Sequence, residues 1–346
     1  MKHARDGIRS NMRSVALRAG VSSATVSRVI NGSPEVKEET AQRVRRAIQE
    51  LDFIPNPIAT TLKYGRSKTY GVIVPDLTNP FYPEFLLDFE QVLVENDQEL
   101  LLATTQSSEP KLISSVRRML MRQVDGVVLM ASEFDTRSIE PLFNRRIPIV
   151  TVDRRQALTG AGDVGIDFEG GYRQAILHLR DLGHKRIGFI GGVAEIRTSQ
   201  IRLEAFQQAL LDAGLTYHSR FTRYGDYRVA GGEAASRSLL MEPQRPTAIL
   251  TANDLTAFGV LRALHVAGVS VPSEMSVVGF DGIQLSGTMP TSLTTISISG
   301  RELAQTCVKS MDYMRANLTK RGLLLTVGGT LVVRESTAVA PTRNRP

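Results

Sequence analysis

The amino-acid sequence predicts a small helical module at the N-terminus, followed by a larger α/β body made of two doubly wound lobes. The first observation behind this prediction is length, because 346 residues exceed what one compact core usually holds. The second is apolar patterning, which is helical over residues 12–52 and alternates between short apolar runs and amphipathic stretches from Tyr70 onward. The third is charge, because residues 1–68 contain 13 Lys or Arg and 6 Asp or Glu, a surplus equal to the whole net charge of +7.

Composition excludes several classes of protein. No apolar run approaches the roughly 18 residues that a membrane span needs, and the stretch MKHARDGIRSNM lacks the apolar core of a signal peptide. We therefore expect a cytoplasmic protein without membrane contact. The single cysteine, Cys307, rules out an intramolecular disulfide, and its amphipathic surroundings predict a buried small hydrophobic residue.

The first predicted helix covers Met12–Ala19. Asn11 is a suitable N-cap and Gly20 a suitable stop. The apolar face of this helix is predicted to consist of Met12, Val15, Ala16 and Ala19.

Two further helices follow a tight turn. Ser22 can cap a helix from Ser23 to about Ile30, so the hydroxyl-rich stretch AGVSSATVSRVIN contains a helix start and is not a loop throughout. A third helix over roughly residues 36–52 is predicted to bury Val44, Ala47, Ile48 and Leu51. This is the helix-turn-helix layout, in which the N-terminal residues of the second helix enter the DNA major groove. Together with the local positive charge, it predicts nucleic-acid binding.

These motifs resemble those of a known family. The runs VA at 15–16, AGVS at 19–22, TVSRVIN at 25–31 and LDFIPN at 51–56 are similar to the headpiece of the lactose-repressor (LacI/GalR) family of bacterial transcription regulators. The resemblance extends over nearly the whole chain and implies a DNA-binding repressor controlled by a small-molecule effector. The family commonly has Asp at the position of Ser14 and a small N-cap residue at that of Lys37, so we expect weaker helix caps at both.

The resemblance implies which residues of this helix-turn-helix contact DNA. The first two residues of the recognition helix choose the bases, and here Ser23 can offer one hydrogen bond and Ala24 only a methyl contact. Arg28, one turn later on the same face, can grip guanine in bidentate fashion. The expected DNA-binding residues of the headpiece, with those that cap the helix or contact phosphate, are Ser22, Ser23, Ala24, Thr25, Ser27, Arg28, Asn31 and Asn56.

A short connecting segment, residues 56–67, comes next. Pro57 suits the first turn of a helix and Gly65 ends it after barely two turns, which makes such a helix marginal without a partner. In the family this segment is a hinge helix that folds on the operator, and Leu62 and Lys63 match the leucine-lysine pair that enters the minor groove. The alternative is a plain linker.

The body alternates strand-like and helix-like stretches, which predicts parallel doubly wound sheets with helices on both faces. By resemblance it is a two-lobed, periplasmic-binding-protein-like fold. We expect the headpiece at residues 9–55, the hinge at 56–67 and the effector-binding and dimerisation domain at 68–340. Lobe 1 would take about 68–167 and 299–327, and lobe 2 about 168–298 and 328–340. No coiled-coil heptad follows Arg343, which favours a homodimer.

Polar residues end several of the predicted strands of the body. Ligands of open α/β sheets bind outside the carboxyl ends of the strands, and carboxylates, an amide and one arginine there suit a hydroxyl-rich ligand. The alternative for any single one, such as Asp76 or Asp254, is a helix cap.

By resemblance, effector-contacting positions are those of Asp153, Arg202, Asn253 and Asp281, and wall positions are those of Phe81, Tyr82, Thr198 and Tyr227. Asp76 is expected from its place at a strand end. The expected effector-binding residues are Asp76, Phe81, Tyr82, Asp153, Thr198, Arg202, Tyr227, Asn253 and Asp281. Phe81 and Tyr82 can stack on a sugar ring or a base, or belong to the ordinary core. Arg202 would open the helix that follows RIGFIGG. The family often has a second acidic residue after Asp281, where this chain has Gly282.

No enzyme pattern is present in the sequence. GFIGG at 188–192 lacks the G-x-G-x-x-G spacing, the five histidines have no metal-binding spacing, and no nucleophile elbow occurs. We therefore expect no catalysis, no cofactor and no metal. The expected partners are double-stranded operator DNA, a second copy of the chain and a small effector, sugar-like or, alternatively, a nucleobase. The competing function is a solute-binding protein of the same body fold without gene regulation.

Overall fold

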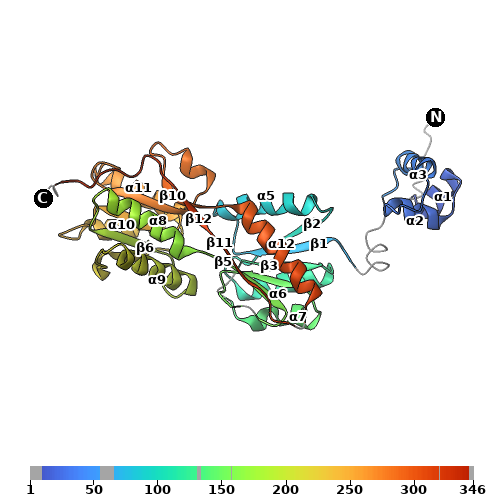
Figure 1. The fold of residues 1–346 in the computed structure, drawn as a ribbon, viewed down its shortest axis with the longest axis horizontal. Coiled ribbons are helices and arrows are strands. Elements are labelled where there is room, and N and C mark those ends of the chain that lie inside the picture. Colours follow the sequence, from blue (N-terminus) through green and yellow to red (C-terminus); the bar gives the residue numbers. More distant parts are fainter. Residues whose placement is uncertain (1–9, 55–65, 131–133, 157, 319, 343–346) are drawn as a thin grey trace, which may run out of the picture. The chain divides into compact units, whose positions relative to one another are not determined.

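A computed structural model of the chain describes residues 10–54, 66–130, 134–156, 158–318 and 320–342 (Figure 1). The chain divides into two compact units, Met1–Ser67 and Lys68–Pro346. We call them the headpiece unit and the body, and each is described by itself. No described helix is long and apolar enough to cross a membrane.

The headpiece unit contains three helices, α1 (Met12–Ala19), α2 (Ser23–Ile30) and α3 (Glu38–Glu50). The bounds of α1 and α2 confirm the prediction, whereas α3 is two residues shorter at each end than expected. Gly20 ends α1 in the left-handed conformation, with φ of 65°, which a residue without Cβ adopts at low cost.

Its core is a single cluster made of Val15, Ala16, Ala19, Val26, Val44, Ala47 and Phe53. The predicted core residues Ile48 and Leu51 are partly buried and pack against this cluster. The prediction for Met12 is wrong, because 39% of that residue is exposed at the first position of α1.

The expectation of a weak cap at Ser14 is also wrong. The Asn11 side chain accepts a hydrogen bond from Ser14 N at 2.9 Å, and Ser14 Oγ accepts one from Asn11 N at 2.9 Å. This reciprocal pair is a capping box, in which two backbone donors at the helix start are satisfied together. At Lys37 the expectation is confirmed, because no side chain caps α3 there.

The body is built on two six-stranded sheets within its described residues. The first sheet has the order β11-β5-β4-β3-β1-β2 and is parallel throughout. Its strands are β1 (Thr69–Val74), β2 (Glu99–Thr104), β3 (Gly126–Leu129), β4 (Ile149–Val152), β5 (Ala161–Ile166) and β11 (Leu324–Val327). The inner strands are continuous apolar runs because both of their faces are buried. We call this part lobe 1.

The second sheet, the basis of lobe 2, has the order β12-β10-β9-β8-β6-β7. Its strands are β6 (Ile187–Gly191), β7 (Thr222–Tyr224), β8 (Ala248–Thr251), β9 (Ser276–Asp281), β10 (Thr294–Ile298) and β12 (Gly329–Val332). The edge strand β12 is antiparallel to β10, and the other pairs are parallel.

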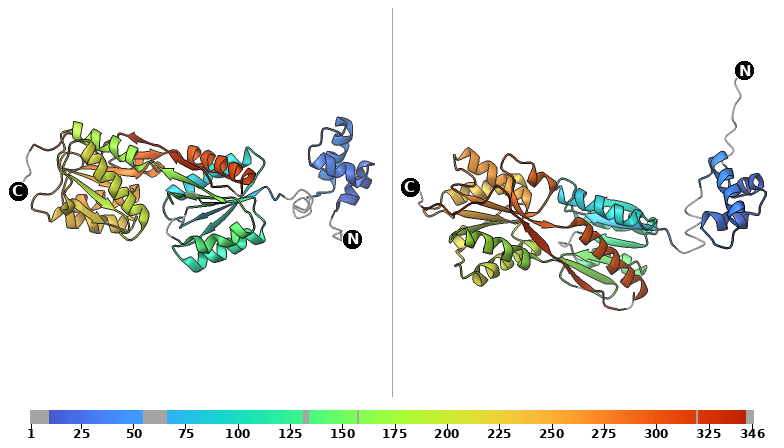
Figure 2. Two further views of the ribbon diagram at one scale, coloured as in Figure 1. Left: turned by 60° about the horizontal axis from the view of Figure 1, so that its bottom comes forward. Right: turned by 45° about the horizontal axis from the view of Figure 1, so that its top comes forward.

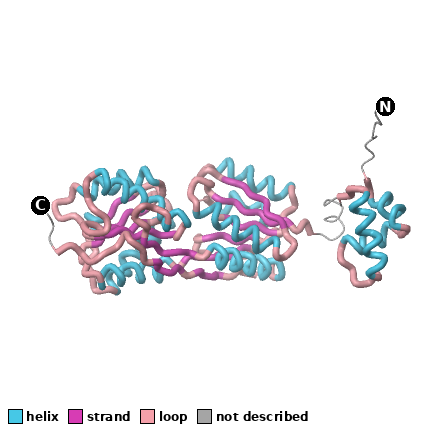
Figure 3. The backbone as a smooth tube through the Cα atoms, turned by 90° about the horizontal axis from the view of Figure 1, so that it is seen from above, coloured by secondary structure: helices cyan, strands magenta, loops and turns pink. Residues whose placement is uncertain are grey.

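Helices cover both faces of each sheet, as the turned views show (Figure 2, Figure 3). Lobe 1 carries α5 (Phe81–Val94), α6 (Glu109–Met121), η1 (Thr136–Ile139), α7 (Glu140–Asn144) and α12 (Gly300–Ala316). Lobe 2 carries α8 (Phe168–Asp181), α9 (Arg197–Asp212), η2 (Ser219–Phe221), α10 (Val229–Leu240), α11 (Asp254–Val266) and η3 (Gln284–Gly287). The predicted doubly wound fold is confirmed.

The chain passes between the lobes after β5, after β10 and between β11 and β12 (Figure 2). The helix α12 returns to lobe 1, where it packs against α5 and β5. Cys307 on α12 is fully buried, which confirms its prediction as a core residue, and burial raises the pKa of its thiol. Because the strands of both sheets end toward the crossings, the polar residues that follow them come together between the lobes.

Candidate functional site

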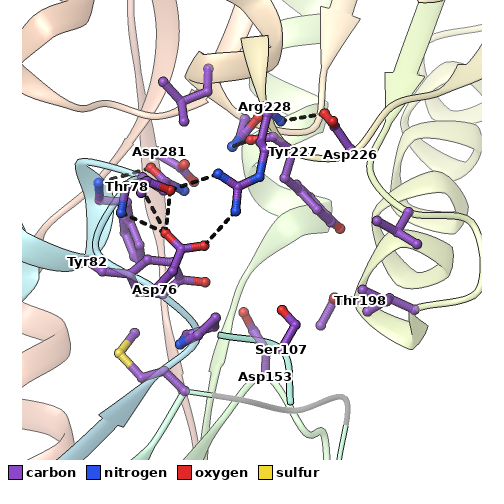
Figure 4. Close-up of a pocket in the computed structure, with 18 of the residues that line it drawn as sticks. Asp76, Thr78, Tyr82, Ser107, Asp153, Thr198, Asp226, Tyr227, Arg228 and Asp281 are labelled. Carbon is purple, nitrogen blue, oxygen red and sulfur yellow. Dashed lines mark hydrogen bonds and ion pairs between the residues drawn. The ribbon is translucent and has the colours of Figure 1, made fainter. Parts of the chain in front are cut away.

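A cavity of about 360 Å³ lies between the two lobes (Figure 4). The nine residues predicted from the sequence all lie on its wall, namely Asp76, Phe81, Tyr82, Asp153, Thr198, Arg202, Tyr227, Asn253 and Asp281. The wall also contains residues that were not predicted from the sequence, namely Pro75, Thr78, Asn79, Ser107, Met130, Val152, Ile166, Val193, Ile196, Asp226, Arg228 and Leu255. The predicted strand ends therefore show where the cavity lies, whereas no sequence pattern predicts several loop residues of its wall.

Arg202 forms a charged base of this cavity. It lies in the second turn of α9, which begins at Arg197, so the expectation that Arg202 opens the helix is wrong. Its guanidinium is buried, stands 4.2 Å from the ring centre of Phe168 and 4.7 Å from that of Phe280, and donates from Nη1 to the carbonyl of Ala252. The aromatic faces hold the guanidinium by cation–π attraction. Its buried Nε–H donor is left without a protein acceptor among the described residues.

Asp153 follows β4 with a left-handed backbone, φ of 58°. Its Oδ1 accepts a hydrogen bond from Ile166 N at 2.7 Å and lies 3.9 Å from Arg155 Nε. The loop that carries Asp153 is held in place by buried Asp163, which accepts hydrogen bonds from Arg154 N and Arg155 N at 3.0 and 2.9 Å. Burial raises the pKa of Asp153 to about 6, so a proton on this carboxyl is bound far more tightly than in water.

Asp281 ends β9 and is also buried, with its pKa raised well above the ordinary value by burial. The side chain of Asn79, from lobe 1, hydrogen-bonds to it. The next residue, Gly282, has φ of 75°, and a Cβ there would overlap the backbone of Ser297. An acidic side chain at position 282 would therefore overlap Ser297 in this backbone.

Asn253 has both ends of its amide engaged. It is the N-cap of α11, where Oδ1 accepts from Thr256 N at 3.0 Å and from the Thr256 hydroxyl at 2.6 Å. Its Nδ2 donates to the carbonyl of Tyr227 at 3.0 Å. Asn253 therefore positions the wall as well as facing the cavity. Its neighbour Asp254 is not on the wall but accepts from Gly282 N and Ile283 N, each at 3.0 Å.

Asp76 is not free to take several ligand hydroxyls in this arrangement. Its Oδ1 accepts from Thr78 N and the Thr78 hydroxyl, each at 2.7 Å, and from Asn79 N at 3.2 Å. Its Oδ2 lies 3.1 Å from Arg228 Nη2, and Arg228 Nη1 donates to Thr78 Oγ1 at 2.9 Å. Since Arg228 belongs to lobe 2, these contacts join the lobes across the cavity (Figure 4). We call Asp76, Thr78 and Arg228 the interlobe clasp.

The remaining predicted residues form the less polar wall. The rings of Phe81 and Tyr82, at the start of α5, meet edge to face with centres 5.6 Å apart. Tyr227, with φ of 63°, shares a 2.6 Å hydrogen bond between its hydroxyl and Ser199 Oγ. A Cβ at Gly192 would overlap the Tyr227 ring, so a glycine is required beneath it.

In the headpiece, the predicted reading residues lie on one exposed side of α2. Ser22 is the N-cap, and its Oγ accepts from Thr25 N at 3.1 Å and lies 3.0 Å from Thr25 Oγ1. Asn31 is the C-cap, and its side-chain amide donates to the carbonyl of Ser27. Ser23 is half-buried, whereas Ala24 and Arg28 are exposed. Three predicted DNA contacts, Asn56, Leu62 and Lys63, lie outside the described residues.

Two family models match the chain. The model of bacterial regulatory proteins of the lacI family covers residues 11–56, and the periplasmic binding protein-like domain covers residues 176–337. The ribose operon repressor of Escherichia coli strain K12 is 34% identical over 302 residues, which are 86% of this chain and 91% of the relative. The repressor PurR of Actinobacillus pleuropneumoniae serotype 3 is 36% identical over 307 residues, 88% and 90% of the two chains.

The chain belongs to the LacI family of bacterial regulatory proteins. Solved structures of similar proteins agree with this. A complex of the regulator CelR with cellobiose has 32% identity and a TM-score of 0.69, and covers 95% of this chain and all of that one. A Lac repressor dimer bound to operator and the anti-inducer ONPF has 26% identity and a TM-score of 0.82, with 95% and 99% covered.

Membership of the LacI family settles the class of function. This LacI-family chain is a DNA-binding transcription regulator, and its family is one of regulators and not of enzymes. The expected helix-turn-helix headpiece and the periplasmic-binding-protein-like body are confirmed. The alternative of a solute-binding protein without gene regulation is set aside, because the lacI model matches the headpiece itself.

Proposed function

We propose that this chain is a repressor whose operator affinity is controlled by a small, uncharged, hydroxyl-rich metabolite, a sugar, bound between the two lobes. The observation that supports this most strongly is the grouping of buried Asp153 and Asp281 around the aromatic-backed guanidinium of Arg202. Such a set offers both acceptors and a donor to neighbouring hydroxyl groups. The cavity volume of about 360 Å³ lies within the range of small-molecule sites.

The charge of the cavity wall favours a neutral ligand. Arg228 is already paired with Asp76 at 3.1 Å, which leaves Arg202 as the cation that faces the two buried carboxyls. Burial disfavours the charged forms of Asp153 and Asp281 and raises the pKa of both. A phosphate or carboxylate on the ligand would lie beside them and would carry the same cost of losing its water. Two similar regulators have sugars in their structures, since one is a complex with cellobiose and one from Enterococcus faecium has bound ribose.

The aromatic residues support a nucleobase as the second candidate ligand. Phe81, Tyr82 and Tyr227 all lie on the cavity wall, and aromatic rings stack on the flat face of a base as well as on a sugar ring. A base, however, presents fewer hydroxyl groups to Asp153 and Asp281 than a sugar does. We therefore place the sugar first.

We further propose that the chain acts as a homodimer on a near-palindromic operator in the cytoplasm. Two recognition helices would occupy successive major grooves, with Ser23, Ala24 and Arg28 toward the bases, while Leu62 and Lys63 of paired hinge helices enter the central minor groove. A similar regulator, the Lac repressor, binds its operator as a dimer. Effector binding must then act through different affinities for two arrangements of the dimer, typically by about 1–3 kcal/mol.

A thermal-shift screen tests the effector proposal. The full chain would be heated with neutral sugars, sugar acids, sugar phosphates and nucleobases, because a ligand held in the cavity raises the melting temperature by mass action. We expect neutral sugars to give the shift. A hit should also change the affinity for an operator selected from random duplexes. If only anionic ligands or nucleobases shift the melting temperature, the sugar proposal fails.

A further inference from the structure

Arg28, the proposed base-reading arginine of the headpiece, has a carboxylate beside it. Arg28 Nε lies 3.6 Å from Glu35 Oε2, and both side chains are exposed, by 58% and 72%. Among the described residues of the headpiece, ion pairs also join Arg18 to Glu50 and Arg45 to Glu38, but neither involves the recognition helix α2. At 3.6 Å the contact with Glu35 is an electrostatic attraction without a formed hydrogen bond.

The loop after α2 holds Glu35 in this place. Gly32 takes the left-handed conformation with φ of 66°, and Ser33 N then donates to the carbonyl of Arg28 at 2.9 Å. The Glu35 backbone N lies 3.4 Å from Ser33 Oγ, and Val36 N lies 3.4 Å from the Ser33 carbonyl. These hydrogen bonds fold the loop back on the end of α2 and so bring the backbone of Glu35 close to Arg28.

An exposed arginine near DNA has two competing partners. Phosphate oxygens attract it wherever the protein lies on the duplex, and this attraction supplies essentially all non-specific binding. Guanine attracts it only at the correct base, through two parallel hydrogen bonds in the major groove. Arg28 stands in the last turn of α2, behind the residues by which a recognition helix enters the groove first, so we expect its long side chain to reach phosphate as well as bases.

We propose that Glu35 is a specificity-determining residue of DNA recognition, because it holds Arg28 away from phosphate and leaves the guanidinium fork to guanine. The carboxylate faces Nε, so Nη1 and Nη2 remain available for the two hydrogen bonds to a base. The same carboxylate repels phosphate oxygens, which penalises every non-specific site. This inference rests on the proposed role of Arg28 as a base reader.

The test uses the full chain with two matched glutamate variants. Glu35→Gln removes the charge beside Arg28, and Glu39→Gln removes one exposed charge of the same headpiece, on α3, as the control. Affinity and its salt dependence would be measured for two duplexes of equal length, an operator selected by the wild-type chain and a scrambled sequence. Circular dichroism would check that both variants keep their helices.

We expect Glu35→Gln to raise the affinity for the scrambled duplex by about three- to tenfold and the magnitude of its salt slope by about one, because Arg28 then reaches a phosphate. Operator affinity should rise less, so the specificity ratio falls. Glu39→Gln should change both duplexes equally and less. Equal effects of the two variants, or a loss of operator affinity without a gain on scrambled DNA, would overturn the inference.

A double-mutant experiment tests the inference about Glu35 separately from the proposed role of Arg28. In an Arg28→Met background, the effect of Glu35→Gln should shrink to that of Glu39→Gln. If Arg28→Met alone leaves the base preference of the operator unchanged, Arg28 is not a reader and that proposal fails. If Arg28→Met alters the base preference but the two glutamate variants still differ in that background, Glu35 acts on DNA without Arg28 and only the inference fails.

Discussion

Arg228 of lobe 2 reaches Asp76 of lobe 1 across the cavity, with 3.1 Å between Nη2 and Oδ2. Thr78 accepts a second hydrogen bond from the same guanidinium at 2.9 Å. A further hydrogen bond joins the lobes: Gln284 N of lobe 2 donates to the carboxylate of Glu84 in lobe 1 at 3.1 Å. The interlobe clasp therefore holds the two lobes together across the cavity through protein side chains alone.

Arg228→Gln should weaken effector binding by opening the clasp. The guanidinium is 55% exposed, so the pair is worth at most about 1 kcal/mol, and we expect a two- to fivefold weaker affinity with a faster dissociation rate. Stopped-flow measurement on the sugar found by the screen would show this. Arg237→Gln, which removes an exposed arginine that pairs with Glu233 on α10, is the control. Tighter binding in Arg228→Gln would mean that Arg228 competes with the ligand for Asp76.

Asp153→Asn should change how stability depends on pH. The folded-state pKa of Asp153 is raised to about 6 by burial, so its ionised form opposes folding at pH 8, and that penalty is removed as the pH falls through 6. Relative to Asp153→Asn, the wild type should gain on the order of 1 kcal/mol of unfolding free energy between pH 8 and pH 5. Asparagine can still accept the hydrogen bond from Ile166 N.

Urea unfolding of the wild type and Asp153→Asn at several pH values measures this difference in unfolding free energy. The contributions of other titrating groups cancel because both proteins contain them. His178 and His184, whose pKa values are lowered by burial, are among those groups. A difference that stays constant from pH 8 to pH 5 would contradict the raised pKa.

Gly282→Ala should destabilise the body strongly. The glycine has φ of 75°, and a Cβ there would overlap the backbone of Ser297, so strain and overpacking add and the cost should exceed about 2 kcal/mol. Gly268→Ala is a matched control, because φ is 69° there but no atom lies within 4 Å of the added Cβ. It should cost about 1 kcal/mol. Equal unfolding midpoints in urea for the two variants would disprove the steric argument.

The residues that were predictable from sequence are those whose position follows from local patterns. The bounds and caps of α1 and α2 depend on neighbours such as Asn11 and Gly20. Asp153 and Asp281 lie on the cavity wall because they end parallel strands, a relation that the apolar runs already reveal. Their role as effector contacts stays a proposal.

The residues that were missed depend on contacts between distant segments or on an unusual backbone conformation. Arg228 follows a predicted wall residue, but it lies 152 residues from Asp76 in the chain, and the two side chains pair only because the two lobes come together. Ser107 reaches the wall through a left-handed backbone with φ of 52°, which a serine adopts rarely. No periodicity in the sequence predicts the pairing of Arg228 with Asp76 or the backbone conformation of Ser107.

Leu62→Ala should reduce operator affinity by about tenfold to hundredfold. Leu62 lies outside the described residues, and the prediction rests on the family resemblance, by which this side chain wedges a base step and kinks the duplex. Without the wedge the bend is lost, and with it about 1–3 kcal/mol of wrapped contacts. Leu17→Ala, at an 87% exposed leucine of α1, removes the same atoms elsewhere and should have little effect. Fluorescence anisotropy would give the affinity and circular-permutation gels the bend. If both quantities are unchanged in Leu62→Ala, the segment is a linker and the coupling from body to DNA must run through another element.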